Sequence, residues 1–258
     1  MANLLRLRKP HAPAGMIAVA CLLWATDSVI RYPAAMKVDH HWLVFAETLV
    51  GLVAMLPVVI WKFRWNQLLP KPKDILPILV IGIGGSALGG IFFTEAFGYL
   101  GPSTATLFQM IQPAVVVGFA YLFLGERHSG VFFQCALWVI LNAIVIGYAN
   151  FDFGFTLAQG EELTKGIGLS ILAMLCWGAA TVAGKSLLFR YPPLQVIFYR
   201  WVVALALLLP WAILSGGTPP WGEALNPSFF IPLLLPVSAF MAQAKTESRK
   251  HNKKTAQI

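Results

Sequence analysis

Charged side chains are scarce in this chain of 258 residues. Asp, Glu, Lys and Arg make up 12% of it, whereas hydrophobic residues make up 58%. A soluble domain of this length needs far more polar surface. The composition therefore excludes a soluble globular protein. Because backbone groups cannot stay unpaired in lipid, it predicts an all-α integral membrane protein.

Cysteine is also scarce, and familiar catalytic motifs are absent. The three cysteines, Cys21, Cys135 and Cys176, are odd in number and show no C-x-x-C spacing. The sequence therefore predicts neither a disulfide framework nor a metal site. Walker, G-x-G-x-x-G, H-E-x-x-H and Ser-His-Asp arrangements are not evident. We expect no enzyme, no cofactor and no ATP-driven pump.

Long apolar runs dominate the chain instead. Each is close to the roughly 20 residues that an α-helix needs to cross the hydrocarbon core. Eight runs qualify: Ala14–Ile30, Trp42–Trp61, Ile75–Phe97, Ser103–Leu124, Val131–Ala149, Gly166–Leu188, Leu194–Leu214 and Phe229–Ala244. The sequence thus predicts a bundle of about eight transmembrane helices in a lipid bilayer.

The positive charges alternate between the predicted loops. With the N-terminus inside, fifteen of the nineteen Lys and Arg residues fall in inside segments and three fall in outside segments. This asymmetry follows the positive-inside rule. It predicts a multi-pass protein of the cell membrane with both termini cytoplasmic. The net charge of +8 is then a topology signal, and nucleic acid is not an expected partner.

The beginning of the chain is repeated further along. Gly15–Ile60 aligns without a gap on Gly168–Ile213, with an offset of 153 and eleven identities in forty-six positions. Five predicted spans precede the second copy, so it enters the membrane in the opposite sense. Inverted-topology repeats are typical of secondary transporters. The pattern therefore favours transport of a small molecule.

Glycines crowd the third predicted span. Small residues at helical spacing let helix backbones approach closely in a membrane bundle. This spacing predicts tight packing, with a thin, mobile wall beside a cavity as a compatible second role. The residues concerned are Gly82, Gly84, Gly85, Gly89 and Gly90, with Ser86 among them.

Several stretches together resemble the EamA-type drug/metabolite transporter superfamily. They are LLWATDSVI at 22–30, its echo LCWGAATVA at 175–183, FYRWVVALALLLP at 198–210 and FGYLGPSTATLFQMIQPAVVVGFAYLFLGER at 97–127. The resemblance implies ten helices in two inverted repeats of five. It also implies alternating access and the export, less often the uptake, of small metabolites such as amino acids, or of drugs.

The resemblance divides the chain into four parts. Residues 1–150 form a first repeat, 151–165 an outside linker, 166–244 an incomplete second repeat and 245–258 a basic cytoplasmic tail. The last two helices of the ten are not found in the sequence. We therefore keep two alternatives to an independent transporter: a shortened remnant without transport activity, and a protein that needs a partner, such as a second copy in a homodimer.

Four ionisable residues interrupt the predicted spans: Asp27, Glu47, Glu95 and Arg200. A charge at the centre of a membrane helix costs about 2.5–3.5 kcal/mol on insertion scales, so such groups face a cavity or one another. Glu47 and Arg200 occupy equivalent positions of the repeat. If both lie near the pseudo-twofold axis, they form a salt bridge that a substrate or a proton could break. Otherwise they are a static lock, or too far apart to meet.

Other residues are candidates to line a substrate cavity. Trp24 and its repeat equivalent Trp177 could form a cavity floor or serve packing alone. Pro113 predicts a helix kink, and the neighbouring Gln109 and Gln112 could line a site there or bond between helices. Asp27 is spaced to pair locally with Arg31, or it could be an entrance group for a charged substrate. Glu95 is either solvated near the outer surface or, if deeper, a proton relay. An intramembrane enzyme would need convergent carboxylates, which the spacing of the three acidic residues does not provide.

Overall fold

A computed structural model of the chain describes residues 31–125 and 160–217, with a few single positions between 130 and 145. All regular structure in these residues is helical. Four described helical segments are long and apolar enough to cross a membrane: 40–62, 72–109, 161–188 and 193–214. The predicted spans 14–30 and 229–244, most of span 131–149 and the tail 245–258 lie outside the described residues, so the count of eight is untested.

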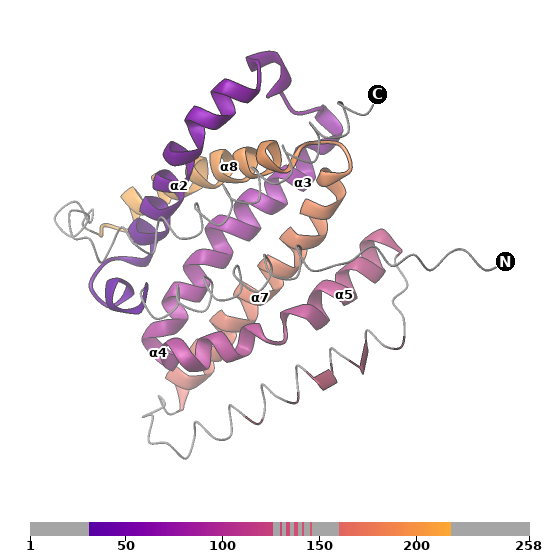
Figure 1. Cartoon of the computed structure of the whole chain (residues 1–258). Coiled ribbons are helices and arrows are strands. Elements are labelled where there is room, and N and C mark those ends of the chain that lie inside the picture. Colours follow the sequence, from indigo (N-terminus) through magenta and orange to yellow (C-terminus); the bar gives the residue numbers. More distant parts are fainter. Residues whose placement is uncertain are drawn as a thin grey trace, which may run out of the picture.

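The second helices of the two repeats pair with each other. Helix α2 covers His40–Lys62 and helix α8 covers Pro193–Leu214. Their N-caps, Asp39 and Pro192, are also equivalent positions of the repeat. The Asp39 carboxylate accepts hydrogen bonds from the first backbone N–H groups of α2, whereas proline offers no such acceptor. The helices lie against each other in Figure 1.

The third predicted span is one long, irregular helix. It begins as α3 (Ile75–Leu79), widens into the π-helical segment η3 (Val80–Leu88) and continues as α4 (Gly89–Gln109). Two 3₁₀ turns, η1 (Trp65–Gln67) and η2 (Pro72–Asp74), lead into it. The residues between the predicted spans Ile75–Phe97 and Ser103–Leu124 are thus mostly helical as well. Only Gly101 leaves helical geometry, at φ 70°, and this single residue redirects the chain.

The fourth predicted span, Ser103–Leu124, is interrupted near its proline. The limb after Gly101 ends at Gln109, and α5 begins at Gln112 with Pro113 in its first turn. The interruption thus covers Met110 and Ile111, just before Pro113, where the sequence predicts a kink. Helix α5 ends at Leu124, where Gly125 adopts the left-handed C-cap geometry.

Helix α7 covers Glu161–Leu188 and begins five residues before the predicted span. Its first turn carries Glu161 and Glu162, which interact favourably with the positive end of the helix dipole. Lys165 adds an ion pair to Glu161 at 3.2 Å. The end of the predicted linker 151–165 is therefore helical.

Glycines of the third span let neighbouring helices approach closely. Helix α7 packs between α4 and α5, and η3 lies against both α7 and α8 (Figure 1). A Cβ atom on Gly82 would lie 2.6 Å from Val203 in α8, and one on Gly85 would lie 2.6 Å from Ala180 in α7. The predicted close packing is thus found at Gly82 and Gly85, and at Gly89 and Gly90 as well, but not at Gly84, where the nearest atom would lie 3.8 Å away.

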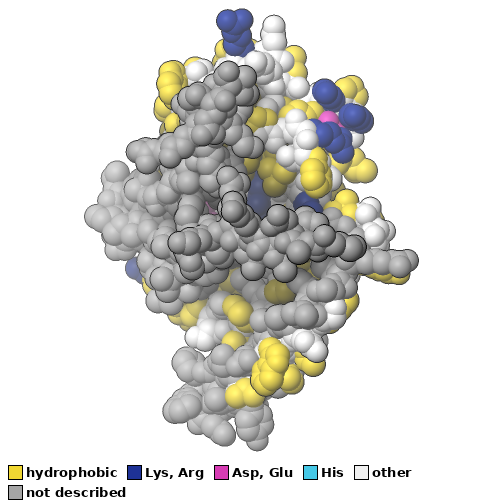
Figure 2. Space-filling model, turned by 45° about the vertical axis from the view of Figure 1, so that its right-hand side comes forward, with side chains coloured by type: hydrophobic (Ala, Val, Ile, Leu, Met, Phe, Trp, Pro, Cys, Tyr) yellow, Lys and Arg dark blue, Asp and Glu magenta, His cyan; other side chains and the backbone are white. Residues whose placement is uncertain are grey.

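The outer surface of the described bundle is largely apolar. Large hydrophobic side chains are exposed on helix ends and faces, such as Trp61 at 88% and Leu214 at 83%. Figure 2 shows hydrophobic side chains spread over the visible face, with most of the visible Lys and Arg side chains in the upper part of the view. An apolar exterior fits a helical bundle surrounded by lipid.

Candidate functional site

Glu47 forms an ion pair inside the first repeat. Its Oε2 lies 2.9 Å from Nη2 of Arg31, which is the first of the helical residues 31–35 at the start of the described chain. The two side chains are only 17% and 13% exposed. Nη1 of Arg31 also donates to Oγ1 of Thr94 at 3.4 Å. The pair therefore ties the start of the described chain to α2 and α4.

Arg200 has a different environment, although it is the repeat equivalent of Glu47. From α8, its Nε donates to Oγ of Ser86 at 2.6 Å and its Nη2 donates to the carbonyl oxygen of Gly85 at 2.9 Å. Both acceptors are neutral and both belong to η3. Among the described residues, no carboxylate pairs with this guanidinium.

Of the alternatives for Glu47 and Arg200, the salt bridge is therefore not formed, and the two residues bind different partners. Arg31, which the sequence places in an outer segment, folds inward and pairs with the Glu47 carboxylate. Arg200 is instead held by the third span, because the glycines there let α8 approach closely enough to bond to the backbone. Asp27, the predicted local partner of Arg31, lies outside the described residues.

The Gly85 carbonyl is a shared acceptor for both helices of the second repeat. The indole Nε1 of Trp177 in α7 donates to it at 2.8 Å, beside the bond from Arg200. The Trp177 ring also packs edge-to-face on Phe93, with ring centroids 5.2 Å apart. π-Helical turns are rare and are frequently found at functional sites. In the π-helical segment, the Gly85 carbonyl oxygen therefore accepts hydrogen bonds from both the Arg200 guanidinium and the Trp177 indole.

Trp24, the repeat equivalent of Trp177, lies outside the described residues. The predicted cavity-floor role of the two tryptophans stays a prediction. Trp177 does contact α4 and η3 rather than lying on the lipid-facing surface, as a packing role and a cavity role both require.

Two buried polar groups near the helix break have no partner in the described part of the chain. Gln109, at the end of α4, is 8% exposed, and its amide nitrogen donates no hydrogen bond. Ser170, in α7, is 1% exposed, and its hydroxyl is likewise unpaired. An unsatisfied buried polar group costs about 1–3 kcal/mol. Gln109 is therefore the better cavity-lining candidate of the two glutamines, because Gln112 is only partly buried.

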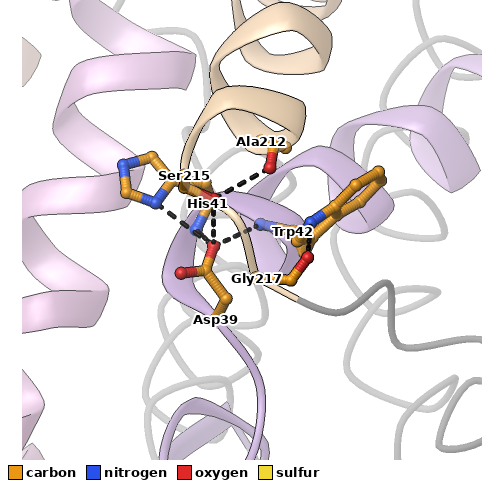
Figure 3. A network of polar contacts seen from close by, with 6 residues as sticks. All are labelled: Asp39, His41, Trp42, Ala212, Ser215 and Gly217. Atoms are coloured by element: carbon orange, nitrogen blue, oxygen red, sulfur yellow. Dashed lines mark hydrogen bonds and ion pairs between the residues drawn. The ribbon is translucent and has the colours of Figure 1, made fainter.

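A polar network closes one end of the α2–α8 pair (Figure 3). Oδ1 of Asp39 accepts from the backbone N–H groups of His41 and Trp42 and lies 3.3 Å from Oγ of Ser215. The indole Nε1 of Trp42 donates to the carbonyl oxygen of Gly217 at 2.9 Å. We call this the Asp39 end.

Glu95 lies near the Asp39 end. It is partly buried and close enough to His40 for the two to interact electrostatically. Its function stays a prediction.

A second polar network, which the sequence reasoning missed, closes the opposite end. Asp74 is fully buried, and its carboxylate accepts hydrogen bonds from Arg190 and from the Tyr191 hydroxyl, the latter at 2.8 Å. The side-chain amide of Gln195 donates to the carbonyl oxygen of Gln67 at 2.5 Å. We call this the Asp74 end. Asp74 escaped notice because it sits in a basic, proline-rich loop that reads as solvated.

Comparison with known proteins bears on both halves of the chain. The model of the EamA-like transporter family matches residues 13–148 and again residues 164–251. A solved structure titled "Crystal structure of protein" is similar to the chain, with a TM-score of 0.60 at 17% identity. The likeness covers 85% of this chain and 71% of that one, and it concerns the fold alone. No curated protein matches the chain.

Proposed function

Since this multi-pass membrane protein belongs to the EamA-like transporter family, we propose that it is a secondary-active exporter of a small metabolite, such as an amino acid, or of drugs. The family consists of transporters of small molecules. The direction of transport, the kind of substrate and the mechanism are part of what we propose. The mechanism is alternating access, in which the two repeats open the bundle at one end and then at the other.

One observation carries the mechanism: equivalent residues make equivalent contacts at opposite ends of the bundle. Trp42 and Gln195 are repeat equivalents, each near the start of its helix. Trp42 donates to Gly217, just after α8, and Gln195 donates to Gln67, just after α2. Because α2 and α8 run antiparallel, these two latches lie at opposite ends of one helix pair. Release of one latch with retention of the other would open the bundle on one side.

The Glu47–Arg31 pair supports coupling to protons. It is a mostly buried ion pair, and protonation of Glu47 would neutralise the carboxylate that Arg31 binds. The contact between residues 31–35 and α2 would then be weaker. The Asp74 end carries Lys62, Lys71 and Lys73 nearby in sequence, so we assign it to the cytoplasmic side of the cell membrane.

Counterflow into proteoliposomes tests the proposal. Liposomes containing the purified protein and an unlabelled compound are diluted into buffer with the labelled compound, over a panel of amino acids and cationic drugs. At least one compound should accumulate transiently and saturably, faster than in protein-free liposomes. Glu47→Gln should abolish the acceleration of uptake by a pH gradient. If no compound accumulates with the wild-type protein, transport by this chain alone is wrong.

That negative result would favour the partner-requiring alternative. The molecular mass of the purified protein, measured by light scattering with the detergent contribution removed, then shows whether it is a monomer or a homodimer. Counterflow that appears only in the homodimer fraction would support completion of the bundle by a second copy.

A further inference from the structure

We infer that Arg200 holds a carboxylate group of the transported compound. The inference rests on the proposed function and names the substrate class for it: a small monoanionic or zwitterionic metabolite with an apolar part. Its starting point is the absence of a negative partner for this arginine among the described residues, in a helix that is otherwise apolar.

The other described arginines set the expectation. Arg31 pairs with Glu47, and Arg190 pairs with the fully buried Asp74. Arg64 is exposed to the surroundings and needs no partner. Arg200 alone in this set is shielded and yet bonded only to a hydroxyl and a backbone carbonyl. These neutral acceptors orient the guanidinium but leave its charge uncompensated.

The orientation leaves one edge of the guanidinium available. Nε and one N–H of Nη2 form the edge that Ser86 and Gly85 occupy. The opposite edge consists of Nη1 and the second N–H of Nη2, and no described residue accepts from it. A guanidinium has five N–H donors in a fixed planar fork that matches a carboxylate through two parallel hydrogen bonds. The anchored edge therefore pre-positions the free one for an anion.

The surroundings favour a single negative charge next to an apolar group. Trp177 and Arg200 both donate to the Gly85 carbonyl, so the indole ring lies beside the guanidinium. Phe93 packs edge-to-face against that indole ring. Arg200 is the one cation that bonds to Ser86 and Gly85 in the described residues. A phosphate dianion carries two negative charges and would need a second cation to balance them. A carboxylate on an apolar or aromatic body matches this combination of one guanidinium and two rings.

The repeat shows that Arg200 is not needed to balance charge within the protein. The equivalent position in the first repeat is Glu47, which already has Arg31. The position equivalent to Arg31 in the second repeat is Gly184, which has no side chain to offer. The second repeat thus presents an arginine where the first presents a neutralised pair.

Matched ligand pairs test the inference. Purified protein is titrated with benzoate and benzamide, with L-leucine and L-leucinamide, and with inorganic phosphate, and the thermal unfolding midpoint is followed in detergent. The carboxylates should raise the midpoint and the amides should not. Arg200→Gln should weaken carboxylate binding at least about tenfold, the range expected for a lost charge-assisted hydrogen bond. Arg64→Gln, which removes an exposed arginine, should leave binding unchanged.

Each outcome of these titrations either supports or overturns carboxylate binding at Arg200. If carboxylate and amide bind the wild type equally, or if phosphate binds more tightly than both carboxylates, the inference is overturned. Should Arg200→Gln fail to fold, Arg200→Lys keeps the charge but not the fork, and it should bind carboxylates several-fold more weakly. If counterflow shows transport of amines or amides with no effect of Arg200→Gln, the inference fails while the proposed function stands. If nothing is transported but carboxylates still bind at Arg200, the proposed function fails and the site stands.

Discussion

Positions 47 and 200 occupy the same place in the two repeats and have opposite surroundings. Glu47 is paired with Arg31 across 2.9 Å, whereas Arg200 bonds to Ser86 and the Gly85 carbonyl. The first repeat therefore neutralises its buried charge internally. In the second repeat, neutral hydrogen-bond acceptors orient the Arg200 guanidinium. The two repeats thus share the same helices at this position but carry opposite charges, and the proposed functions assign proton coupling to the first and substrate binding to the second.

The largest effect should come from breaking the ion pair. Glu47→Gln removes the carboxylate that binds Arg31 in a mostly buried position. Removal of one member of a buried pair costs about 3 kcal/mol. The thermal unfolding midpoint in detergent should fall by several degrees.

The double variant Glu47→Gln with Arg31→Gln is the control for this loss. Replacement of both members of a buried pair is often close to neutral, so most of the stability should return. A double variant as unstable as the single one would show that Glu47 acts through groups other than Arg31.

A somewhat smaller effect is expected from the glycines that hold Arg200 in place. Gly85→Ala puts a Cβ atom 2.6 Å from Ala180 and 3.3 Å from Nη2 of Arg200, and overpacking of this kind costs about 1–3 kcal/mol. Gly84→Ala, in the same π-helical segment, meets nothing closer than 3.8 Å. Unfolding midpoints should separate the two variants clearly. Equal midpoints would contradict the close approach of α7 to η3.

The two N-caps provide a comparison of intermediate size. Asp39→Ala removes the acceptor of two backbone hydrogen bonds at the start of α2 and should cost about 1 kcal/mol. Pro192→Ala, at the equivalent cap of α8, removes no side-chain bond and should cost far less. The comparison is made by unfolding in SDS. A larger loss for Pro192→Ala would mean that proline rigidity matters more than capping here.

The smallest effect concerns the exposed start of α7. Glu161→Gln removes an ion pair with Lys165 in which both side chains are more than half exposed. Such pairs contribute less than about 0.5 kcal/mol and are screened by salt. The unfolding midpoint should shift slightly at low ionic strength and not at all in 1 M salt. A large shift in high salt would show that Glu161 has a structural role beyond the pair.

Much of the frame could be predicted from the sequence, because it depends on periodicity and on the special geometry of a few residues. The repeat predicted where α2 and α8 lie in the chain. The glycine spacing predicted close helix contacts at η3, and Pro113 indicated the region where the helix is interrupted. The partners of the buried charges could not be predicted. They depend on where residues 31–35 fold and on the π-helical widening that exposes the Gly85 carbonyl, and neither leaves a periodic signal.

Two-sided cysteine labelling tests alternating access most directly. Cys21, Cys135 and Cys176 are replaced, and a single cysteine is introduced at Ser215 near the Asp39 end or at Asn66 near the Asp74 end, both exposed positions. Trp42→Phe removes the Asp39-end latch, worth about 1 kcal/mol, which corresponds to a population shift of about fivefold. Labelling at Ser215→Cys should then rise while labelling at Asn66→Cys falls, and Gln195→Ala should produce the reverse. Labelling that changes only at the mutated end, with the opposite end unaffected in both variants, would contradict the account.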